Sequence, residues 1–112
     1  MTDSFRAPPF TVETERTGST AIVAVVGELD IATSPQLRAA LAGLEPGYER
    51  LAVDLSRCSF FASSGIPILL EENARAEREG FELVIVKATP EVQRMFDLAG
   101  LDELLTFQEP PA

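Results

Sequence analysis

The segment Cys58-Ser59-Phe60-Phe61-Ala62-Ser63-Ser64-Gly65-Ile66-Pro67 separates two apolar runs of different periodicity. The run before it, residues 51–55, is short and rich in aliphatic side chains, which is typical of a buried strand. After it, apolar residues recur at the spacing of a helix: Ile66, Leu69, Leu70 and Ala74. The segment is therefore predicted to lead from a strand into a helix, with Ser63 or Ser64 as the N-cap of that helix.

A serine at a helix start lies beside backbone N–H groups that have no intrahelical partner, and beside the positive end of the helix dipole. Negative charge at such a position is stabilised by about 0.3–1 kcal/mol when it is exposed. Pro67 is compatible with the first turn, because its missing N–H would have no carbonyl partner there. A phosphate on Ser63 or Ser64 is therefore compatible with the fold, although it changes the surface charge sharply.

The length of 112 residues predicts a single domain. Such a chain buries roughly 60–70% of its unfolded surface and holds one core unaided. We expect a flexible arm over residues 1–9, one domain over residues 10–107 and a frayed C-terminus over residues 108–112. No apolar run approaches the ~20 residues of a membrane span, so we expect no membrane association.

The composition excludes several classes of function. Nine basic and eighteen acidic residues give a net charge of −9, and no basic cluster is interleaved with aromatic residues, so we expect no nucleic-acid partner. The absence of histidine removes Ser-His-Asp and Cys-His catalysis, and with a single cysteine it also removes the usual zinc sites. We therefore expect no metal, no cofactor and no enzyme activity.

Two features of the chain predict a cytoplasmic location. The N-terminus lacks the basic start and the apolar core of a secretory signal. The single cysteine, Cys58, has no partner in the chain for a disulfide, and we interpret it as a small buried hydrophobe.

The rest of the chain alternates between strand and helix patterns. Strands are predicted at residues 10–15, 20–26, 51–55 and 81–86, and the end of the domain is either a short turn at 101–105 or a terminal strand at 104–107. Turn residues make the first two strands an antiparallel hairpin, and the later crossovers through helices imply parallel pairing. The predicted fold is a single α/β domain with a mixed four- to five-stranded sheet, an N-terminal antiparallel hairpin and helices packed over it.

Three helices are predicted from their cap residues. The first begins at Thr33, which is placed to form a capping box with Gln36, the second covers residues 64–78, and the third begins at Thr89. Each helix is expected to end at a glycine: Gly43, Gly80 and Gly100.

Three motifs occur in a characteristic order. They are Gly-Glu-Leu-Asp at residues 27–30 before a Thr-capped helix, Phe-Ala-Ser-Ser-Gly-Ile at residues 61–66, and Arg-Met-Phe-Asp-Leu-Ala-Gly-Leu at residues 94–101. Together they resemble the STAS family, and within it the SpoIIAA-like bacterial anti-anti-sigma factors, which are anti-sigma factor antagonists. The resemblance covers about residues 10–107, and it rests on the order and spacing of the motifs, because no single motif is decisive.

This resemblance implies a regulator and not an enzyme. In such proteins the serine at the start of the helix after the third strand is phosphorylated by an anti-sigma factor that is itself a serine kinase. Only the unphosphorylated form binds that anti-sigma factor, which frees the sigma factor to join RNA polymerase, and a PP2C-type phosphatase usually resets the switch. The implied partners are therefore an anti-sigma factor kinase and such a phosphatase, and we expect a monomer or a weak dimer.

The family motif is commonly Asp-Ser-Ser/Thr-Gly with the first serine as acceptor, so the resemblance assigns phosphorylation to Ser63, with Ser64 as the alternative. Asp30 aligns with the acidic residue that ends the second strand. Ala62 stands where the family has aspartate, so a carboxylate that orients the hydroxyl or helps the kinase recognise it is missing, unless Asp30 supplies it. The implied partner-binding residues are Asp30, Ala62, Ser63, Ser64 and Gly65.

Other interpretations stay open at this point. The missing carboxylate at Ala62 favours a STAS scaffold or anion-binding regulatory module that works without phosphorylation. A serine hydrolase using Ser63 requires a base, and the chain has no histidine and only one lysine. Ser63 is a plain N-cap in the simplest interpretation, and Asp30 a turn or cap residue. At least one of Phe60 and Phe61 is expected in the core, and the other in the core or in a docking patch, since adjacent strand residues point to opposite faces.

Overall fold

The computed structural model describes residues 10–111, and its sheet begins with the hairpin that the sequence predicts. β1 (Thr11–Thr17) and β2 (Thr20–Leu29) are antiparallel and are joined by a tight turn in which Gly18 has a φ of +60°. β1 is the exposed edge strand, whereas the middle of β2 is buried, as its near-continuous apolar sequence indicates. The arm predicted for residues 1–9 lies outside the described residues.

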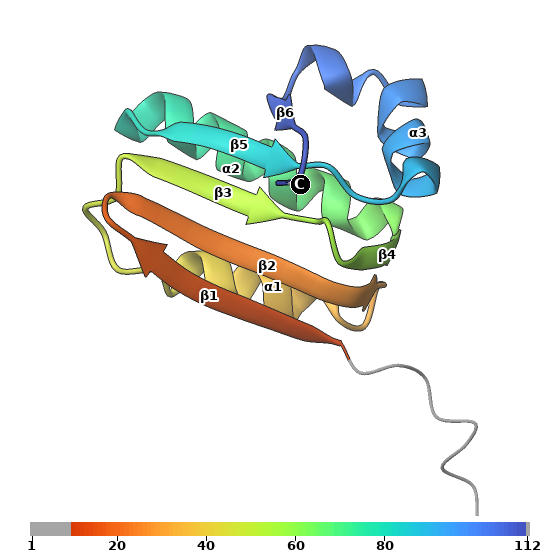
Figure 1. Ribbon diagram of the computed structural model, residues 1–112, viewed down its shortest axis with the longest axis horizontal. Coiled ribbons are helices and arrows are strands. Elements are labelled where there is room, and N and C mark those ends of the chain that lie inside the picture. Colours follow the sequence, from red (N-terminus) through yellow and green to blue (C-terminus); the bar gives the residue numbers. More distant parts are fainter. Residues whose placement is uncertain (1–9, 112) are drawn as a thin grey trace, which may run out of the picture.

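The other strands extend the sheet in parallel (Figure 1). β3 (Arg50–Asp54) pairs with β2, β5 (Glu82–Val86) pairs with β3, and the short β6 (Phe107–Gln108) pairs with β5. The strand order is β1-β2-β3-β5-β6, and β4 (Cys58–Phe61) pairs with β2 off this path. The predicted fold class, an α/β domain with a mixed sheet and an N-terminal antiparallel hairpin, is confirmed, but the sheet has six strands over the described residues where four to five are predicted.

β4 is a strand that the sequence pattern does not predict. β2 is long enough to have two parallel neighbours, because residues 20–24 pair with β3 and residues 27–29 pair with β4. Between Gly27 and Glu28 the register of the second pairing shifts, and the left-handed φ of Gly27, +99°, accommodates this irregularity. The chain therefore returns to the end of β2 before it enters the second helix.

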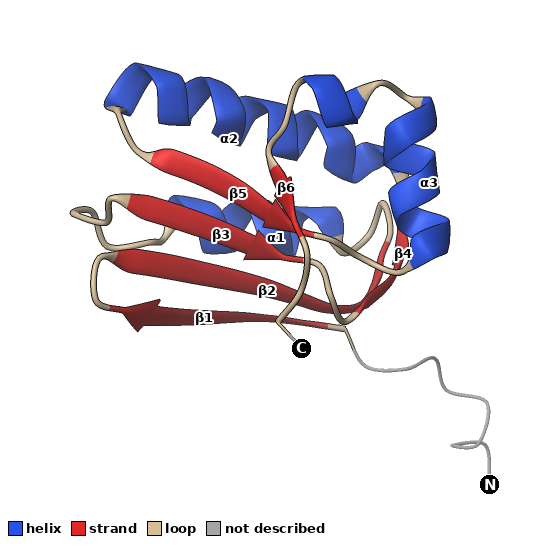
Figure 2. Cartoon of the chain, turned by 45° about the horizontal axis from the view of Figure 1, so that its top comes forward, coloured by secondary structure: helices blue, strands red, loops and turns tan. Residues whose placement is uncertain are grey.

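Within residues 10–111, three helices and two short 3-10 turns complete the fold (Figure 2). The helices are α1 (Ser34–Ala42), α2 (Ile66–Glu79) and α3 (Pro90–Leu98), and the turns are η2 (Ser63–Gly65) and η3 (Leu101–Glu103). α1 and α2 lie on one face of the sheet, α1 against β1 and β2 and α2 against β5, while α3 stands beside β4. No helix in the described range combines the length and the apolar character that crossing a bilayer requires.

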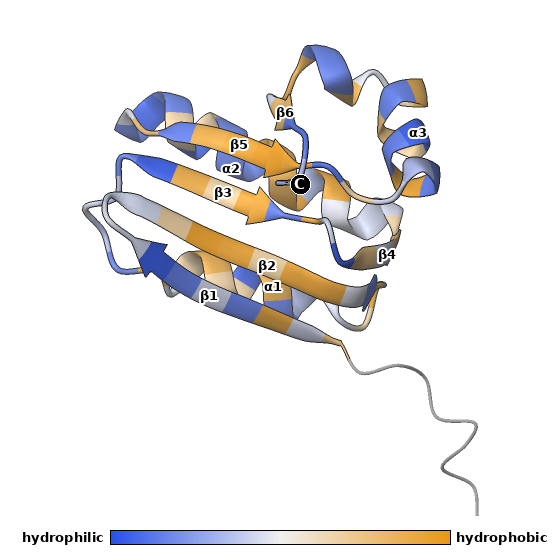
Figure 3. Cartoon of the chain, viewed as in Figure 1, coloured by the Kyte–Doolittle hydropathy of each residue, from blue (hydrophilic) through white to orange (hydrophobic). Residues whose placement is uncertain are grey.

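The core lies between the sheet and the helices. β2, β3 and β5 are the apolar centre of the sheet (Figure 3), and their inward side chains pack against buried leucines of α1 and α2. Near β4 the core is aromatic, since Phe96 of α3 lies 5.0 Å from Phe61 and 5.7 Å from Phe107 between ring centroids. Each fully buried side chain of this size contributes about 1.5–3 kcal/mol of hydrophobic stabilisation.

The helix caps agree with the sequence prediction at Thr89 and at the helix C-termini, but not at Thr33 or at the start of α2. Thr89 caps α3, because its hydroxyl accepts a hydrogen bond from the Val92 N–H, and Gly80 ends α2 in the left-handed conformation with a φ of +84°. Gly43 is the C-cap of α1 as predicted, and Gly100 follows the end of α3. Thr33 is the N-cap residue of α1, but the predicted capping box is wrong: its side chain makes no cap bond, because its hydroxyl is bonded to Asp30.

Candidate functional site

The residues singled out in the sequence meet at the carboxyl end of β2. The loop that holds Asp30 leaves β2 there, and Ala62 at the end of β4 donates its N–H to the carbonyl of Leu29 at 2.8 Å. This one hydrogen bond places the segment before Ser63 beside the segment before Asp30. The carboxyl ends of parallel strands are where α/β sheets usually carry their sites, because the loops that leave them converge.

The three residues of η2 face three different surroundings. Ser63 is exposed, Ser64 is half-buried and forms a hydrogen bond with Ser34 at 2.8 Å, and Gly65 is buried. A Cβ atom on Gly65 would lie 2.5 Å from the ring of Phe61 and 2.6 Å from Leu29, so only glycine fits without rearrangement. Successive residues of a 3-10 helix are about 120° apart, which explains how one turn presents one residue to solvent, one to α1 and one to the core.

Neither serine acts as the helix N-cap that the sequence predicts. Ala62 is the N-cap residue of η2, with a φ of −71° and a ψ of 157°, and Gly65 directly precedes α2. No side-chain cap bond is formed at either position. The prediction of a serine N-cap is wrong because the 3-10 turn η2 precedes α2. Both serines lie inside this turn, between its N-cap Ala62 and the N-cap of α2, Gly65.

Asp30 forms a closed turn with Thr33. Its carboxylate oxygen Oδ1 accepts hydrogen bonds from the Thr33 N–H at 2.8 Å and from the Thr33 hydroxyl at 2.9 Å. These bonds to Thr33 hold the pKa of Asp30 below its ordinary value, so the group is an anion at neutral pH. Asp30 is therefore a turn residue, as the simplest interpretation of the sequence predicts, and its side chain is exposed.

A second link joins the Asp30 loop to η2. The hydroxyl of Ser34 donates to the backbone carbonyl of Asp30 at 2.7 Å and also meets the hydroxyl of Ser64. Ser34 is 6% exposed and was not singled out in the sequence, because a serine after a threonine at a helix start carries no separate signal. The link depends on two residues thirty positions apart, which only the fold brings together.

Two exposed apolar side chains flank this region. Phe60 is 50% exposed and Ile31 is 79% exposed, whereas Phe61 is buried at 3%. Phe60 lies opposite Glu28 in the β2–β4 pairing, and Ile31 directly follows Asp30. The expectation that at least one of the two phenylalanines belongs to the core is confirmed, and Ile31 is an exposed residue that the sequence pattern did not mark.

A protein-family comparison identifies the fold that carries this site. The family model described as "Mlab, STAS domain" matches residues 12–106. The chain belongs to the STAS domain family. The match includes all the described strands and helices of the domain except the first residue of β1 and the short β6.

Individual relatives of this STAS domain are anti-sigma factor antagonists. The anti-sigma F factor antagonist of Paenibacillus polymyxa is 28% identical over 96 residues, which cover 84% of this chain and 82% of that protein. The anti-sigma-B factor antagonist of Staphylococcus aureus is 28% identical over 88 residues, which cover 78% of this chain and 82% of that protein. The crystal structure of an anti-sigma factor antagonist from Mycobacterium paratuberculosis matches with a TM-score of 0.75 at 28% identity, covering 95% of this chain and 92% of that one.

Cys58 of the STAS domain lies beneath the site as a buried, inert thiol. Its Sγ donates to the Phe60 carbonyl at 3.2 Å, and burial raises the pKa of the thiol above its ordinary value. A reactive cysteine needs the opposite, an exposed thiol with a lowered pKa. The interpretation of Cys58 as a small buried hydrophobe is therefore confirmed.

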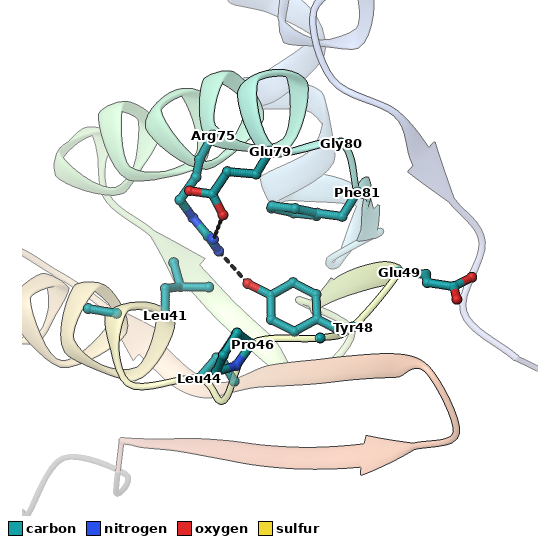
Figure 4. A pocket seen from close by; sticks show the side chains of 11 residues that line it. Leu41, Leu44, Pro46, Tyr48, Glu49, Arg75, Glu79, Gly80 and Phe81 are labelled. Atoms are coloured by element: carbon teal, nitrogen blue, oxygen red, sulfur yellow. Dashed lines mark hydrogen bonds and ion pairs between the residues drawn. The ribbon is translucent and has the colours of Figure 1, made fainter.

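A hollow of about 400 Å³ lies at the other end of the domain, between α1, α2 and the loop before β3 (Figure 4). The guanidinium of Arg75 crosses it, donating to Glu72, to Glu79 and, at 2.6 Å, to the hydroxyl of Tyr48. The same guanidinium lies 4.8 Å from the centre of the Phe81 ring, a cation–π distance. Because the donors of Arg75 are already bonded to groups of the protein, this cluster ties α2 to the neighbouring loop.

Proposed function

We propose that this STAS domain is an anti-sigma factor antagonist controlled by phosphorylation of Ser63. In its unphosphorylated form it binds a cognate anti-sigma factor that is a serine kinase, and the sigma factor held by that protein is released. A PP2C-type phosphatase restores the binding form. The observation that carries the proposal is the exposed hydroxyl of Ser63 on η2, at the convergence of the β2 and β4 ends. The relatives named above, which are antagonists of anti-sigma factors, support the choice of partner.

The transfer step needs only an accessible hydroxyl on this side. The Oγ of Ser63 attacks the γ-phosphorus of ATP held by the kinase, and a new O–P bond forms. The bond from that phosphorus to the β,γ-bridging oxygen breaks, ADP leaves, and the hydroxyl proton passes to a base of the kinase. The STAS domain therefore acts as the substrate of the reaction, while the kinase supplies its catalytic groups.

The electrostatics of the surface explain why a phosphate would end binding. A phosphoserine carries about −1.5 to −2 charges at neutral pH, and it would join a chain whose net charge is already −9, beside the anionic carboxylate of Asp30. Burying this charge in an interface without a matched cation costs several kcal/mol. The proposed partner surface comprises Asp30, Ala62, Ser63 and Ser64, and Gly65 contributes the close packing beneath them.

The proposal is tested with substitutions that mimic or remove the modification. We expect the Ser63→Ala variant to bind the purified cognate anti-sigma kinase as well as the wild type does, because the hydroxyl itself is small and solvated. Ser63→Asp and Ser63→Glu are expected to bind at least about tenfold more weakly, a factor that corresponds to roughly 1.4 kcal/mol. Binding is measured by isothermal titration calorimetry.

A matched control separates a local effect from a general effect of charge. Ser19 is an exposed serine in the β1–β2 turn, at the opposite end of β2 from the site. The Ser19→Asp variant adds the same charge there and is expected to bind like the wild type. Equal affinities for the Ser63 and Ser19 acidic variants would refute the switch at Ser63.

A second candidate function, a STAS module that binds its partner without phosphorylation, is favoured by Ala62. This residue stands where the family has a carboxylate, and the carboxylate of Asp30 is bonded to Thr33. The two candidates differ after incubation of the wild type and the Ala62→Asp variant with source-cell extract and ATP. Phosphate on Ser63 of the wild type supports the switch, whereas phosphate only on the Ala62→Asp variant supports the second candidate.

A further inference from the structure

η2 contains two neighbouring hydroxyl groups, those of Ser63 and Ser64, and their surroundings differ. Ser63 is exposed, while Ser64 is half-buried against the buried Ser34 at the first position of α1. The family resemblance assigns phosphorylation to Ser63 and gives Ser64 as the alternative, without a physical reason from the residues themselves. The hydrogen bonds of Ser34 supply a physical reason for a choice between them.

The direction of these hydrogen bonds follows from counting protons. The backbone carbonyl of Asp30 can only accept, so the single hydroxyl proton of Ser34 is donated to it, over 2.7 Å. In the bond of 2.8 Å between Ser34 and Ser64, the Ser34 oxygen is therefore the acceptor and Ser64 is the donor. The result is a directed chain from the Ser64 hydroxyl through the Ser34 hydroxyl to the Asp30 carbonyl.

This chain has opposite consequences for the two serines. The proton of Ser64 points into the protein toward a residue that is 6% exposed, so a kinase base can take it only after the bond to Ser34 breaks. Fixing Ser64 against α1 also turns Ser63, about 120° away on the same 3-10 turn, toward solvent. The hydrogen bond between Ser34 and Ser64 therefore makes the Ser64 hydroxyl less accessible to a kinase and leaves the Ser63 hydroxyl accessible.

We propose that Ser34 is a positioning residue that directs phosphoryl transfer to Ser63 by engaging the hydroxyl of Ser64. This inference rests on the proposed function, because it concerns which hydroxyl receives the γ-phosphate of ATP. Ser34 itself touches neither ATP nor the transferred group. It acts through Ser64, and it links the turn formed by Asp30 and Thr33 to η2.

The first measurement uses the unmodified protein without any kinase. Proton NMR of the wild type is expected to show exchange of the Ser64 hydroxyl proton with water roughly five- to tenfold slower than exchange of the Ser63 hydroxyl proton, the factor expected for one hydrogen bond. The Ser34→Ala variant is expected to lose this difference, and Ser34→Thr, which keeps a hydroxyl, is expected to retain it. Equal exchange of the two protons in the wild type would overturn the proposal, even if Ser34→Ala fails to fold.

The second measurement maps the phosphate by mass spectrometry of the peptide that contains both serines, after incubation with the purified cognate kinase and ATP. The wild type and Ser34→Thr are expected to carry phosphate on Ser63. In Ser34→Ala the ratio of phosphate on Ser64 to phosphate on Ser63 is expected to rise roughly five- to tenfold. A ratio unchanged in folded Ser34→Ala overturns the role of Ser34 alone. Absence of phosphate from both serines in every variant overturns the phosphorylation switch itself and the role of Ser34 with it.

Discussion

At the scale of single residues, Ser63 and Gly65 show how two positions on one turn differ in what they tolerate. Ser63 faces solvent, so its side chain is free to change, whereas Gly65 lies against Phe61 and Leu29 with no room for a methyl group. The φ of Gly65, −83°, is available to any residue, so backbone conformation does not require glycine there. Glycine is required because a larger side chain would not fit against its neighbours.

We predict that Gly65→Ala destabilises the domain by about 1–3 kcal/mol, the usual cost of forcing an extra methyl group into a packed core. The new Cβ would meet the Phe61 ring at 2.5 Å. Urea unfolding measures the free energy difference. Gly43→Ala is the matched control, since its Cβ would meet nothing closer than 3.3 Å, and a smaller change than about 1 kcal/mol is expected there. Equal losses for the two variants would contradict the packing role of Gly65.

Asp30 gives a pH dependence of known sign. Bonds from Thr33 lower the pKa of Asp30 from its ordinary value of 3.8, so its contribution to stability is present above that pH. The contribution is lost as the pH falls through the lower pKa of the folded state. We therefore predict that Asp30→Asn is less stable than the wild type at pH 7 and that the difference shrinks below about pH 4, measured by thermal unfolding from pH 7 to pH 3. A difference that is constant with pH would rule out the charged hydrogen bonds as its source.

The sequence marks Ser63, Asp30 and Gly65 as candidates, but it does not mark Ser34. The family motif and the strand-to-helix transition point to the first three. The role of Ser34 requires the distance between two oxygens that are thirty residues apart in the chain, and no periodic pattern contains that distance. The predicted side-chain caps of α1 and α2 are absent for a related reason, because local alternatives, the Asp30 turn and η2, compete with capping, whereas the predicted cap at Thr89 is present.

At the scale of elements, α2 is fixed at its two ends by different means. Its beginning is positioned by the packing of Gly65 and by the bond between Ser64 and Ser34, and its last turns are held by Arg75. Arg75 donates hydrogen bonds from Nε and Nη2 to the carboxylate of Glu72, a buried group, and Glu72 raises the pKa of Arg75 above its ordinary value. The direction in which η2 presents Ser63 therefore rests on a helix that is anchored along its length.

This arrangement predicts unequal costs for two ion pairs of α2. Arg75→Ala leaves Glu72 buried without its cation, and we expect a loss of about 2–3 kcal/mol, below the range for a fully buried pair because the Arg75 side chain is 25% exposed. Arg38→Ala removes the partner of Glu71, where both side chains are more than half exposed, and we expect a loss under about 1 kcal/mol. Urea unfolding of both variants decides, and a larger loss for Arg38→Ala would contradict this account of the anchor.

The elements that could be predicted are those with a period long enough to recognise. The hairpin and α2 follow from alternation and from helical spacing, and the glycine after α2 ends it as expected. β4 has only four residues, and its two central residues are both exposed while its ends are buried, so it shows no alternation. The pairing of β4 with β2 shifts register between Gly27 and Glu28, and this irregularity interrupts the alternation by which β4 could be recognised as a strand.

In the molecule as a whole, the two ends of the domain differ in whether their side chains are exposed or bonded to one another. The carboxyl ends of β2 and β4 bring together the Asp30 loop, η2 and the exposed side chains of Ile31 and Phe60. The opposite end contains the Arg75 cluster, in which the charged groups are bonded to one another. The acidic chain therefore has one end whose apolar and hydroxyl groups are available to another protein.

In the proposed switch, a phosphate on Ser63 and a bound anti-sigma factor exclude each other. This exclusion can be measured on protein isolated from its source cell: the partner-bound pool is separated from the free pool, and phosphate on the Ser63-Ser64 peptide of each is measured by mass spectrometry. We expect phosphorylated Ser63 in the free pool and unmodified Ser63 in the bound pool. Phosphorylated Ser63 at the same fraction in both pools would contradict this exclusion.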